Sequence, residues 1–332
     1  MLGVAVVGLG VGEQHAAAYV GLPGCRLLWA YDLDPIKMNQ VIDRLGAGNP
    51  ASSFDAILQD PDVDLVSIAS YDQMHHAQVV AALRAGKHVF VEKPLCQSAL
   101  ELGEIHAAWR ASGRLLRCNL ILQAAPAYRW LRDAIARGEL GDLYAIDGDY
   151  LYGRLDKITT GWRSDVPNYS VMVGGGIHLV DLMVWLSGDR PDRVATVGNR
   201  IVTRDTTYSY FDFMAATFTF KGGLVGRITA NFGCVHRHQH VVRVFGSKGT
   251  FIYDDCGPRL HAHRQDGAAG VPLDLSALPC SKGDLIPAFV AAIVSGADLT
   301  DQTQHDLDVM SACLAADRAV ASGTAQHIDY LR

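Results

Sequence analysis

The first 120 residues alternate short apolar runs with helical patterns, and this alternation constrains the fold more than any other feature of the sequence. Strands are predicted at Gly3–Val7, Arg26–Tyr31, Leu65–Ala69, His88–Val91 and Leu115–Cys118, and helices at Gln14–Val20, Pro35–Leu45, Gln78–Arg84 and Ala99–Trp109. Strands that are apolar on both faces and alternate with helices are typical of a parallel sheet covered on both sides. We therefore predict that residues 1–120 form an α/β domain with a doubly wound parallel sheet.

The pattern changes near residue 120. A helix is predicted at Ala127–Arg137, strands at Leu143–Leu151, Val194–Val202, Tyr208–Phe220, Leu224–Phe232, His240–Phe245 and Thr250–Tyr253, and further helices at Ile177–Leu186, Ile286–Ser295 and His305–Ser322. Many of these strands alternate apolar and polar residues and are joined by glycine-containing turns, which is typical of an antiparallel sheet. Residues 121–332 are therefore predicted to form a second, α+β domain with a large, open, mostly antiparallel sheet.

The composition argues against several classes of partner. A formal net charge of −6 disfavours a nucleic acid or an anionic membrane surface, since both attract basic proteins. No window approaches the roughly 20 apolar residues of a membrane span, and the N-terminus lacks the basic region of a signal peptide. The seven cysteines are scattered and form no CxxC pair, as is typical of free thiols in a reducing compartment. We therefore expect a cytoplasmic protein.

The loop Gly8-Leu9-Gly10-Val11-Gly12 follows the first predicted strand and precedes the first predicted helix. In this context the first glycine permits a tight turn, and the second lets the backbone approach a pyrophosphate near the helix N-terminus. The spacing is GxGxG, one residue shorter than the usual GxGxxG fingerprint. We predict that these residues bind a dinucleotide; the alternative is an ordinary strand–turn–helix connection.

Asp32 closes the second predicted strand, about 20 residues beyond the loop. A carboxylate at this position accepts a hydrogen bond from a ribose 2′-hydroxyl and repels a 2′-phosphate. No arginine follows it directly, so NAD is favoured over NADP. The alternative role, capping the helix that begins at Pro35, suits Asp34 better and leaves Asp32 for the ribose.

A lysine follows the predicted strand His88–Val91, in the sequence Glu92-Lys93-Pro94. A glycine loop and a lysine at the same edge of a sheet indicate an enzyme that handles a proton as well as a nucleotide. Oxidation of a secondary alcohol removes a hydride from carbon, which a nicotinamide accepts, and a proton from oxygen, which a side chain must take. We predict that Lys93 is this side chain; the alternative is a surface lysine in a turn.

Several motifs together resemble the glucose–fructose oxidoreductase / inositol dehydrogenase family, the Gfo/Idh/MocA group. They are Gly8-Leu9-Gly10 with His15, Ser70-Tyr71-Asp72-Gln73-Met74-His75, Ala85-Gly86-Lys87-His88-Val89, Glu92-Lys93-Pro94, Trp162-Arg163, Gly174-Gly175-Gly176-Ile177-His178-Leu179-Val180-Asp181 and Phe245-Gly246-Ser247-Lys248-Gly249. The resemblance implies a Rossmann domain, a second domain whose open sheet often serves oligomerisation, a nicotinamide cofactor and a carbohydrate-like substrate.

The resemblance also implies roles for single residues. Lys93 matches the family's catalytic lysine and His178 its catalytic histidine. Cofactor contacts are implied for Ser70, Tyr71, His75, Glu92, Lys93, Asn119, Trp162 and Arg163. The chain departs from the family in that Gly174 replaces an aspartate four residues before the histidine, Ser70-Tyr71-Asp72 replaces Thr-Pro-Asn, and no arginine follows Asn119. We therefore do not assign the family's full list of substrates to this protein.

His178 and Asp181 lie three residues apart on a predicted helix and so share a face. A carboxylate one turn away orients an imidazole and stabilises its protonated form. The preceding Gly174-Gly175-Gly176 lacks side chains, which we expect to let a ligand approach the helix start. We predict that both residues are catalytic; the alternative for Asp181 is an internal structural carboxylate.

Aromatic and basic residues cluster just before this glycine segment: Tyr150, Tyr152, Arg154, Lys157, Trp162 and Arg163. Aromatic rings suit sugar faces, whereas arginine and lysine suit phosphate. We predict substrate contacts from Lys93, Tyr152, Arg154, Lys157 and His178. Two substrate classes remain open: a sugar that carries phosphate or a nucleotide diphosphate, and an unphosphorylated sugar or cyclitol. A solvated basic loop is the third alternative.

Three histidines, His236, His238 and His240, alternate on a possible strand, a spacing that can bind zinc. No nearby cysteine or carboxylate completes an obvious site, although Cys234 is adjacent, so we predict a strand-end or interface cluster and no metal.

The sequence thus predicts an NAD-dependent oxidoreductase that transfers a hydride between nicotinamide and a secondary alcohol or ketone of a sugar, with Lys93 and His178 handling the proton. One alternative is an enzyme that oxidises and reduces a tightly held NAD within one cycle, for epimerisation or glycoside cleavage. Another is a non-catalytic, NAD-dependent sensor. Exposed aromatic and β-branched residues of the second domain's sheet indicate a homodimer or homotetramer.

Overall fold

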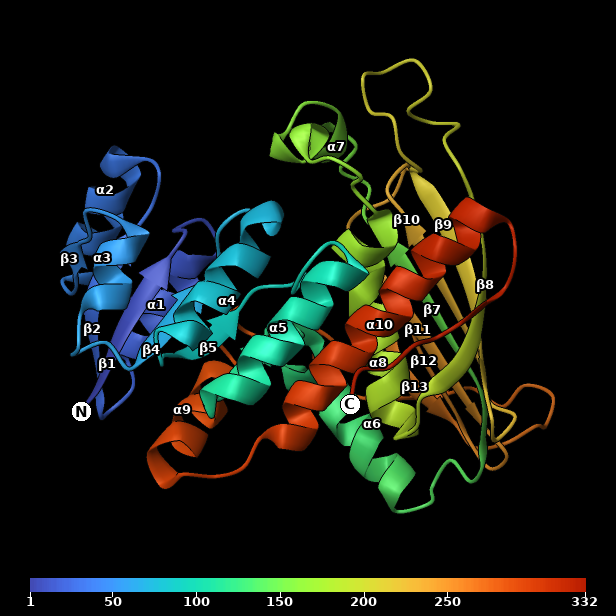
Figure 1. Ribbon diagram of the computed structural model, residues 1–332. Coiled ribbons are helices and arrows are strands. Elements are labelled where there is room, and N and C mark those ends of the chain that lie inside the picture. The colour runs from blue at the N-terminus through green and yellow to red at the C-terminus, as the bar shows by residue number, and fades with distance from the viewer. The chain divides into compact units, whose positions relative to one another are not determined.

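The computed structural model describes residues 1–332, which divide into two compact units (Figure 1). Unit 1 contains Met1–Ile121, Cys280–Leu307 and Leu331. Unit 2 contains Leu122–Pro279, Asp308–Tyr330 and Arg332. The sequence-based division assigned all of 121–332 to the second domain. In the structure, by contrast, Cys280–Leu307 belongs to unit 1.

Unit 1 contains a six-stranded sheet in which every pairing is parallel, as predicted. Its strands are β1 (Leu2–Val7), β2 (Cys25–Tyr31), β3 (Asn49–Pro50), β4 (Leu65–Ile68), β5 (His88–Val91) and β6 (Leu116–Cys118). Their order is β3-β2-β1-β4-β5-β6, so the winding reverses between β1 and β4. Ligands of such sheets bind outside the carboxyl ends of the strands at the point of reversal. The short strand β3 was not predicted, because it carries no β-branched or aromatic residue.

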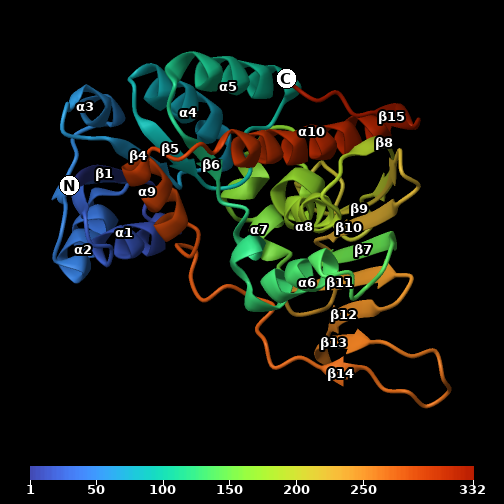
Figure 2. The ribbon, with the colours of Figure 1, turned by 90° about the horizontal axis from the view of Figure 1, so that it is seen from below.

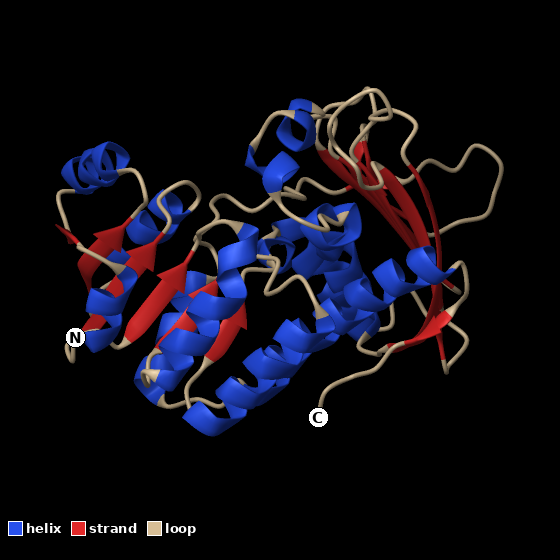
Figure 3. Cartoon of the chain, turned by 45° about the horizontal axis from the view of Figure 1, so that its top comes forward, coloured by secondary structure: helices blue, strands red, loops and turns tan.

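Helices cover both faces of this sheet (Figures 2 and 3). On one face lie α1 (Gly12–Val20), α2 (Pro35–Leu45) and α9 (Ile286–Ser295), and on the other α3 (Phe54–Gln59), α4 (His75–Arg84) and α5 (Ala99–Ser112). Helix α2 begins where Asp34 accepts hydrogen bonds from the N–H groups of Ile36 and Lys37, and it ends at Gly46, whose φ is 61°. These two signals explain why its bounds were predicted to the residue.

Helix α9 belongs to unit 1 because its apolar side chains pack into the core of that unit. Ile286, Phe289 and Val290 are buried and join Tyr19 of α1 and Phe90 of β5 in one apolar cluster. The ring centroids of Phe90 and Phe289 are 5.7 Å apart. Burying such a side chain contributes ~1.5–3 kcal/mol. Helix α9 therefore completes a core that the N-terminal segment leaves open.

Unit 2 is built on a nine-stranded sheet of order β14-β13-β12-β11-β7-β10-β9-β8-β15. Its strands are β7 (Leu143–Leu151), β8 (Pro191–Asn199), β9 (Phe213–Phe220), β10 (Val225–Asn231), β11 (Gln239–Gly246), β12 (Thr250–Asp254), β13 (Gly257–His261), β14 (Val271–Pro272) and β15 (Gln326–His327). All neighbouring pairs are antiparallel except β7 and β10. The prediction of a large, mostly antiparallel sheet is confirmed, although the parallel pair, strand β13 and the edge strands β14 and β15 were not predicted.

Helices cover one face of this second sheet, and the other face carries none (Figures 1 and 2). The covering helices are α6 (Pro126–Ala136), α8 (Ile177–Ser187) and the part of α10 (Thr300–Ser322) that belongs to unit 2. A π-helical segment, Met172–Gly176, leads into α8; such segments occur frequently at functional sites. None of the helices is long and apolar enough to cross a membrane.

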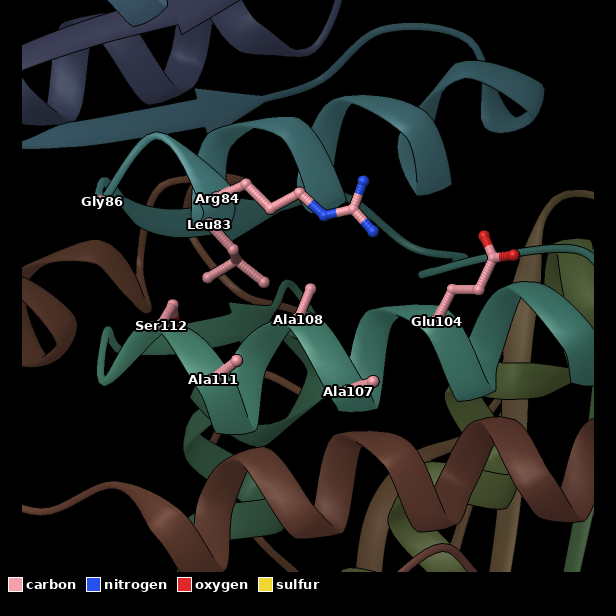
Figure 4. A pocket seen from close by; sticks show the side chains of 8 residues that line it. All are labelled: Leu83, Arg84, Gly86, Glu104, Ala107, Ala108, Ala111 and Ser112. Carbon is pink, nitrogen blue, oxygen red and sulfur yellow. The ribbon is translucent and has the colours of Figure 1, made fainter.

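One surface hollow of unit 1 lies between α4 and α5 and has a volume of about 710 Å³ (Figure 4). Its lining includes Arg84 of α4, Glu104 of α5 and the small side chains Ala107, Ala108 and Ala111. No residue predicted to bind cofactor or substrate lines it.

Candidate functional site

The glycine loop of unit 1 has the space that a pyrophosphate needs. Gly8 has a φ of 83°, and a side chain there would collide with the carbonyl oxygen of Ala69. A Cβ on Gly10 would meet only the Lys37 ammonium, at 3.9 Å, so the space over this glycine is open. A Cβ on Gly12 would lie 3.1 Å from Ala69 Cβ, so this glycine serves the close packing of α1. The shortened loop therefore still provides the turn, the phosphate approach and the helix packing of a dinucleotide site.

Asp32 stands just beyond β2, where its carboxylate is tied to the glycine loop. The Leu9 N–H donates to Oδ2 at 2.6 Å, and the Asp34 N–H donates to Oδ1 at 3.0 Å. The Lys37 ammonium lies 2.9 Å from Oδ2. Burial would raise the pKa of Asp32, but Lys37 and the two N–H groups hold it below its usual value. Asp32 is thus an ionised acceptor at neutral pH, and Asp34 caps α2 as the sequence indicated.

A buried polar cluster lies along the neighbouring strand ends. His15 Nδ1 is 3.0 Å from Ser67 Oγ, and His15 Nε2 is 3.2 Å from Glu92 Oε1. The Asn119 amide donates to the same Glu92 oxygen at 2.6 Å. Burial would raise the pKa of Glu92, but the hydrogen bond and charge of His15, with the charges of nearby lysines that include Lys93, lower it to about 2. Glu92 and Asn119 therefore hold this edge of the sheet together.

Lys93 stands on the loop that follows β5, and its peptide bond to Pro94 is cis. The Pro94 carbonyl oxygen lies 2.7 Å from His75 Nδ1, and His75 Nε2 lies 3.2 Å from the carbonyl oxygen of Ser70. The buried His75 ring thereby joins the loop that carries Lys93 to the loop that follows β4. His75 was predicted to contact the cofactor, and the contacts seen here are with the main chain of these two loops.

The other predicted cofactor contacts at this edge differ in exposure. Ser70 Oγ donates to Gln78 Oε1 at 2.6 Å, so its hydroxyl is engaged within unit 1. Tyr71 is 44% exposed and Val11 38% exposed, whereas Leu9 is buried. Of this group, Tyr71 and Val11 therefore offer side-chain surface to a ligand.

In unit 2, His178 lies in the first turn of α8 within a cluster of rings. Its ring is stacked at 6.3 Å on Tyr150 and stands perpendicular to His240 at 5.6 Å, measured between centroids. The rings of Tyr150 and Tyr152 are stacked at 5.9 Å, and His238 packs edge-on to both. This ring cluster, Tyr150, Tyr152, His178, His238 and His240, brings together residues of β7, α8 and β11 with their neighbouring loops.

Tyrosine rings occupy the space beside Gly174 and Gly175 in the segment ahead of α8, and the approach of a ligand to the start of this helix stays a prediction. A Cβ on Gly174 would collide with the Tyr169 hydroxyl, and a Cβ on Gly175 would collide with the Tyr150 ring. Because these glycines lack side chains, the rings of Tyr169 and Tyr150 can pack against the π-helical backbone. The Tyr169 side chain fills the space that a side chain at position 174 would need.

Asp181 follows His178 by one turn of α8 and is fully buried. Its Oδ1 accepts a hydrogen bond from the Gln123 amide at 2.7 Å. This hydrogen bond connects α8 to the segment that precedes α6. Asp181, predicted to be catalytic, therefore also makes a structural contact.

A hydrogen-bonded pair holds the start of the π-helical segment. Ser170 Oγ accepts from the N–H groups of Met172 and Val173, each at 3.1 Å. The same hydroxyl donates to Asp317 Oδ1 of α10 at 2.6 Å. No sequence pattern links two residues 147 positions apart, so this pair was missed. It fixes the backbone that leads to His178.

The basic residues predicted to contact ligands lie outside the ring cluster. Arg154 and Lys157 are exposed, and the Arg154 guanidinium carbon is 5.6 Å from the Tyr152 ring centroid. The Arg163 guanidinium stacks over Trp162 at 4.2 Å within a 3₁₀ turn. Trp162 and Arg163, predicted as cofactor contacts, belong to unit 2, whereas the glycine loop belongs to unit 1.

The expected alternation of three histidines on one strand is wrong, because β11 begins only at Gln239. His236 precedes the strand and lies 3.4 Å from the Asp255 carboxylate. His238 and His240 pack against each other at 4.9 Å in the ring cluster. The structure contains no group of three or more His, Cys, Asp or Glu side chains arranged to hold a metal.

Comparisons with known proteins agree with this architecture. Residues 2–120 match the model described as "Oxidoreductase family, NAD-binding Rossmann fold", and residues 128–252 match the GFO/IDH/MocA C-terminal domain. The 1,5-anhydro-D-fructose reductase of Ensifer adhaerens is 34% identical over 163 residues, 46% of each chain. The myo-inositol 2-dehydrogenase of Thermotoga maritima is 24% identical over 260 residues, 76% of this chain and 75% of that protein. A solved structure of levoglucosan dehydrogenase in complex with NADH and L-sorbose has a TM-score of 0.86 at 19% identity and covers 99% of both chains.

The two family models fall on the two sheets described above, and the glycine loop with Asp32 offers the geometry that NAD requires. The chain therefore belongs to the Gfo/Idh/MocA family of NAD-binding oxidoreductases.

Proposed function

We propose that this protein is an NAD-dependent dehydrogenase that acts on a secondary alcohol or ketone of a sugar or cyclitol. The proposal rests on one observation about this member of the oxidoreductase family. The chain has an open dinucleotide loop and Lys93 in unit 1, and His178 with its ring cluster in unit 2. The names of the two relatives describe reactions on an anhydrofructose and on an inositol, which supports CH–OH chemistry.

Proton handling is assigned to Lys93 and His178. Bound NAD supplies the hydride acceptor, and a protein side chain must take the proton from the alcohol oxygen. Glu92, the carboxylate beside Lys93, does not serve this purpose near neutral pH, because its pKa is lowered to about 2 and its oxygen is engaged. Asp181 is assigned to orient His178 from one turn away on α8.

The cofactor contacts are assigned as the sequence indicated. The glycine loop Gly8–Gly12 takes the pyrophosphate and Asp32 the adenosine ribose. Further contacts are proposed from Ser70, Tyr71, His75, Glu92, Lys93, Asn119, Trp162 and Arg163.

The ring cluster supports an unphosphorylated substrate. Aromatic faces pack against the C–H faces of sugar rings, and imidazole nitrogens exchange hydrogen bonds with hydroxyls. The cations that would serve a phosphate, Arg154 and Lys157, are exposed, and Lys157 lies 3.8 Å from Asp156 of the short helix α7 (Asp156–Thr159). A phosphorylated or nucleotide sugar is the second candidate, supported by the Arg154 guanidinium 5.6 Å from the Tyr152 ring.

The absorbance of NADH, followed across a panel of free sugars, cyclitols, anhydrosugars, sugar phosphates and nucleotide sugars, tests the proposal. We expect NADH formation with unphosphorylated members of the panel. A selective loss of activity on phosphorylated sugars after Arg154→Ala with Lys157→Ala would instead favour the second candidate. No net NADH from any member, with NAD binding intact by titration, would contradict the dehydrogenase and favour the redox-recycling enzyme or the sensor.

The helix-free face of the nine-stranded sheet supports a homodimer or homotetramer. Val197 and Val225 are 69% and 40% exposed on strands whose alternate residues are buried. Part of the charge on this sheet is paired, as in the 2.6 Å contact between Arg227 and Asp147. We expect light scattering to give the mass of an oligomer and Val197→Asp to reduce it, because an unpaired charge in an interface is costly. A monomeric wild type, or an equal effect of Asp at the loop residue Val235, would contradict this interface.

A further inference from the structure

Ser170 organises the backbone at the start of the π-helical segment in unit 2. Its hydroxyl accepts hydrogen bonds from the N–H groups of Met172 and Val173, each at 3.1 Å. Its carbonyl oxygen accepts a further hydrogen bond from the Gly174 N–H at 2.8 Å. The first N–H groups of a helical segment have no partner within the segment itself. A single residue therefore satisfies three consecutive N–H groups at this end.

Asp317 of α10 sets the direction of the Ser170 hydroxyl, which donates to Asp317 Oδ1 at 2.6 Å. A serine hydroxyl has one hydrogen to donate and two lone pairs that accept. Because Asp317 takes the hydrogen, both lone pairs of the hydroxyl can point towards the N–H groups of Met172 and Val173. Asp317 thus fixes the rotation of the hydroxyl, and Ser170 holds the backbone.

The backbone held in this way leads directly to His178. The Met172 carbonyl oxygen accepts a hydrogen bond from the N–H of Ile177, the residue that precedes His178. Ser170 therefore holds Met172 at its N–H, and Met172 in turn holds the start of α8 at its carbonyl. Two hydrogen bonds connect the Ser170 hydroxyl to the residue beside the histidine.

The segment between Ser170 and His178 has little rigidity of its own. Glycine makes up three of the five residues of Met172–Gly176, and it loses more conformational freedom on folding than any other residue. π-Helical turns are also rare, so contacts from outside the segment must select this conformation. The rings of Tyr150 and Tyr169 limit the space beside the glycines, and the Ser170 hydrogen bonds fix the first turn.

We propose that Ser170 and Asp317 are positioning residues for His178, which act through the π-helical segment and hold the imidazole where proton transfer requires it. The catalytic role of His178 rests on the proposed function, whereas the dependence of its position on Ser170 does not require turnover. His178 is 5% exposed and packs against Tyr150 and His240, so a small movement of the backbone changes its ring contacts. A displacement of about 1 Å at a reacting group can lower a rate on the order of 100-fold.

Ser170→Ala removes the hydroxyl and tests the proposal in the full chain. With the unphosphorylated panel member that gives the fastest NADH formation in wild type, we expect kcat to fall about 10- to 100-fold. The Kd for NAD should change by less than about threefold, because none of the proposed cofactor contacts is removed. The NMR signal of the His178 Cε1–H group, identified by its absence in His178→Gln, should shift, because its position reports the placement of the imidazole among the neighbouring rings.

Two variants of the carboxyl separate hydrogen bonding from general damage. Asp317→Asn keeps an oxygen that accepts from Ser170, so it should retain at least about half of the wild-type kcat and the wild-type His178 signal. Asp317→Leu has a side chain of similar size without an acceptor and should reproduce the effects of Ser170→Ala. Should Ser170→Ala not fold, Ser170→Cys, whose thiol is a weak donor and acceptor, gives the same comparison with a smaller expected fall.

Ser53→Ala is the matched control. The Ser53 hydroxyl accepts from the Ala56 N–H at 3.1 Å at the start of α3 in unit 1, and the loss of such a cap has a similar effect on stability. This control should leave kcat and the His178 signal unchanged.

The proposal would be overturned by a folded Ser170→Ala with wild-type kcat and an unmoved His178 signal, or by an equal fall in kcat in Ser53→Ala or Asp317→Asn. A wild type that binds NAD and forms no NADH with any panel member would remove the proposed function instead. The His178 signal in Ser170→Ala would then decide by itself whether Ser170 positions the imidazole.

Discussion

Replacing Lys93 by alanine is expected to lower kcat for sugar oxidation by about 10²- to 10⁴-fold, the usual contribution of a general acid or base. The variant loses the group that takes the alcohol proton, and the adjacent carboxylate of Glu92, with a pKa of about 2, does not replace it. Binding of NAD should change far less than kcat, because Lys93 is only one of the proposed cofactor contacts and the glycine loop and Asp32 remain. Steady-state NADH formation measures the first quantity and equilibrium titration of NAD the second.

Two further variants sharpen this test. Lys93→Arg keeps the positive charge but stays protonated in proteins, so it should be as slow as the alanine variant; full activity would contradict a proton-transfer role. His178→Ala should also lower kcat. If both residues act on the same step, their effects should combine to less than the product of the two separate losses.

The stability of the protein is expected to fall by roughly 4 kcal/mol between about pH 4 and pH 7 through Asp317 alone. Burial raises the pKa of this carboxyl to about 7, against the opposing effects of the Ser170 hydrogen bond and the Arg318 charge. Between the unfolded pKa and this value the folded chain holds a proton that the unfolded chain releases, so stability is full at low pH and decreases as pH rises. Urea unfolding followed at several pH values measures this slope.

Asp317→Asn should remove most of that slope, since the amide has no proton to lose and its oxygen still accepts from Ser170. The variant should therefore be more stable than wild type at pH 8 and similar to it at pH 4. Asp329→Asn is the matched control, because this carboxylate is exposed and lies 3.5 Å from the same Arg318. An unchanged slope in Asp317→Asn, or an equal change in Asp329→Asn, would contradict the assignment.

Elements with sharp local signals were predictable from the sequence. Strands β5 and β7 and helices α2 and α9 have the predicted bounds. Strand β9 was predicted from Tyr208 but begins at Phe213. The reason is a contact that the pattern does not reveal: Asp212 accepts hydrogen bonds from the N–H and hydroxyl of Thr203, at 2.7 and 2.9 Å, and holds the intervening residues in a loop.

The residues of the candidate site likewise divide into those that could be predicted from the sequence and those that could not. The glycine loop, Asp32 and Lys93 follow strands at fixed spacing, so their neighbourhood could be inferred from the chain itself. The ring cluster could not, because Tyr150 and His240 meet only through the register of β7 with β11, where they stand opposite each other. Lys37 was missed because its proximity to Asp32 depends on how the capped first turn of α2 directs the side chain.

The placement of α9 has a consequence for how the protein is made. A ribosome that has completed β1 to β6 has released the whole parallel sheet, yet Ile286 and Phe289, which cover the apolar surface around Tyr19 and Phe90, are still to be synthesised. Transiently exposed apolar surface is what chaperones and proteases recognise. The nucleotide-binding unit is therefore finished only after translation of nearly the entire chain, and a product truncated before α9 exposes apolar surface of the kind that chaperones and proteases recognise.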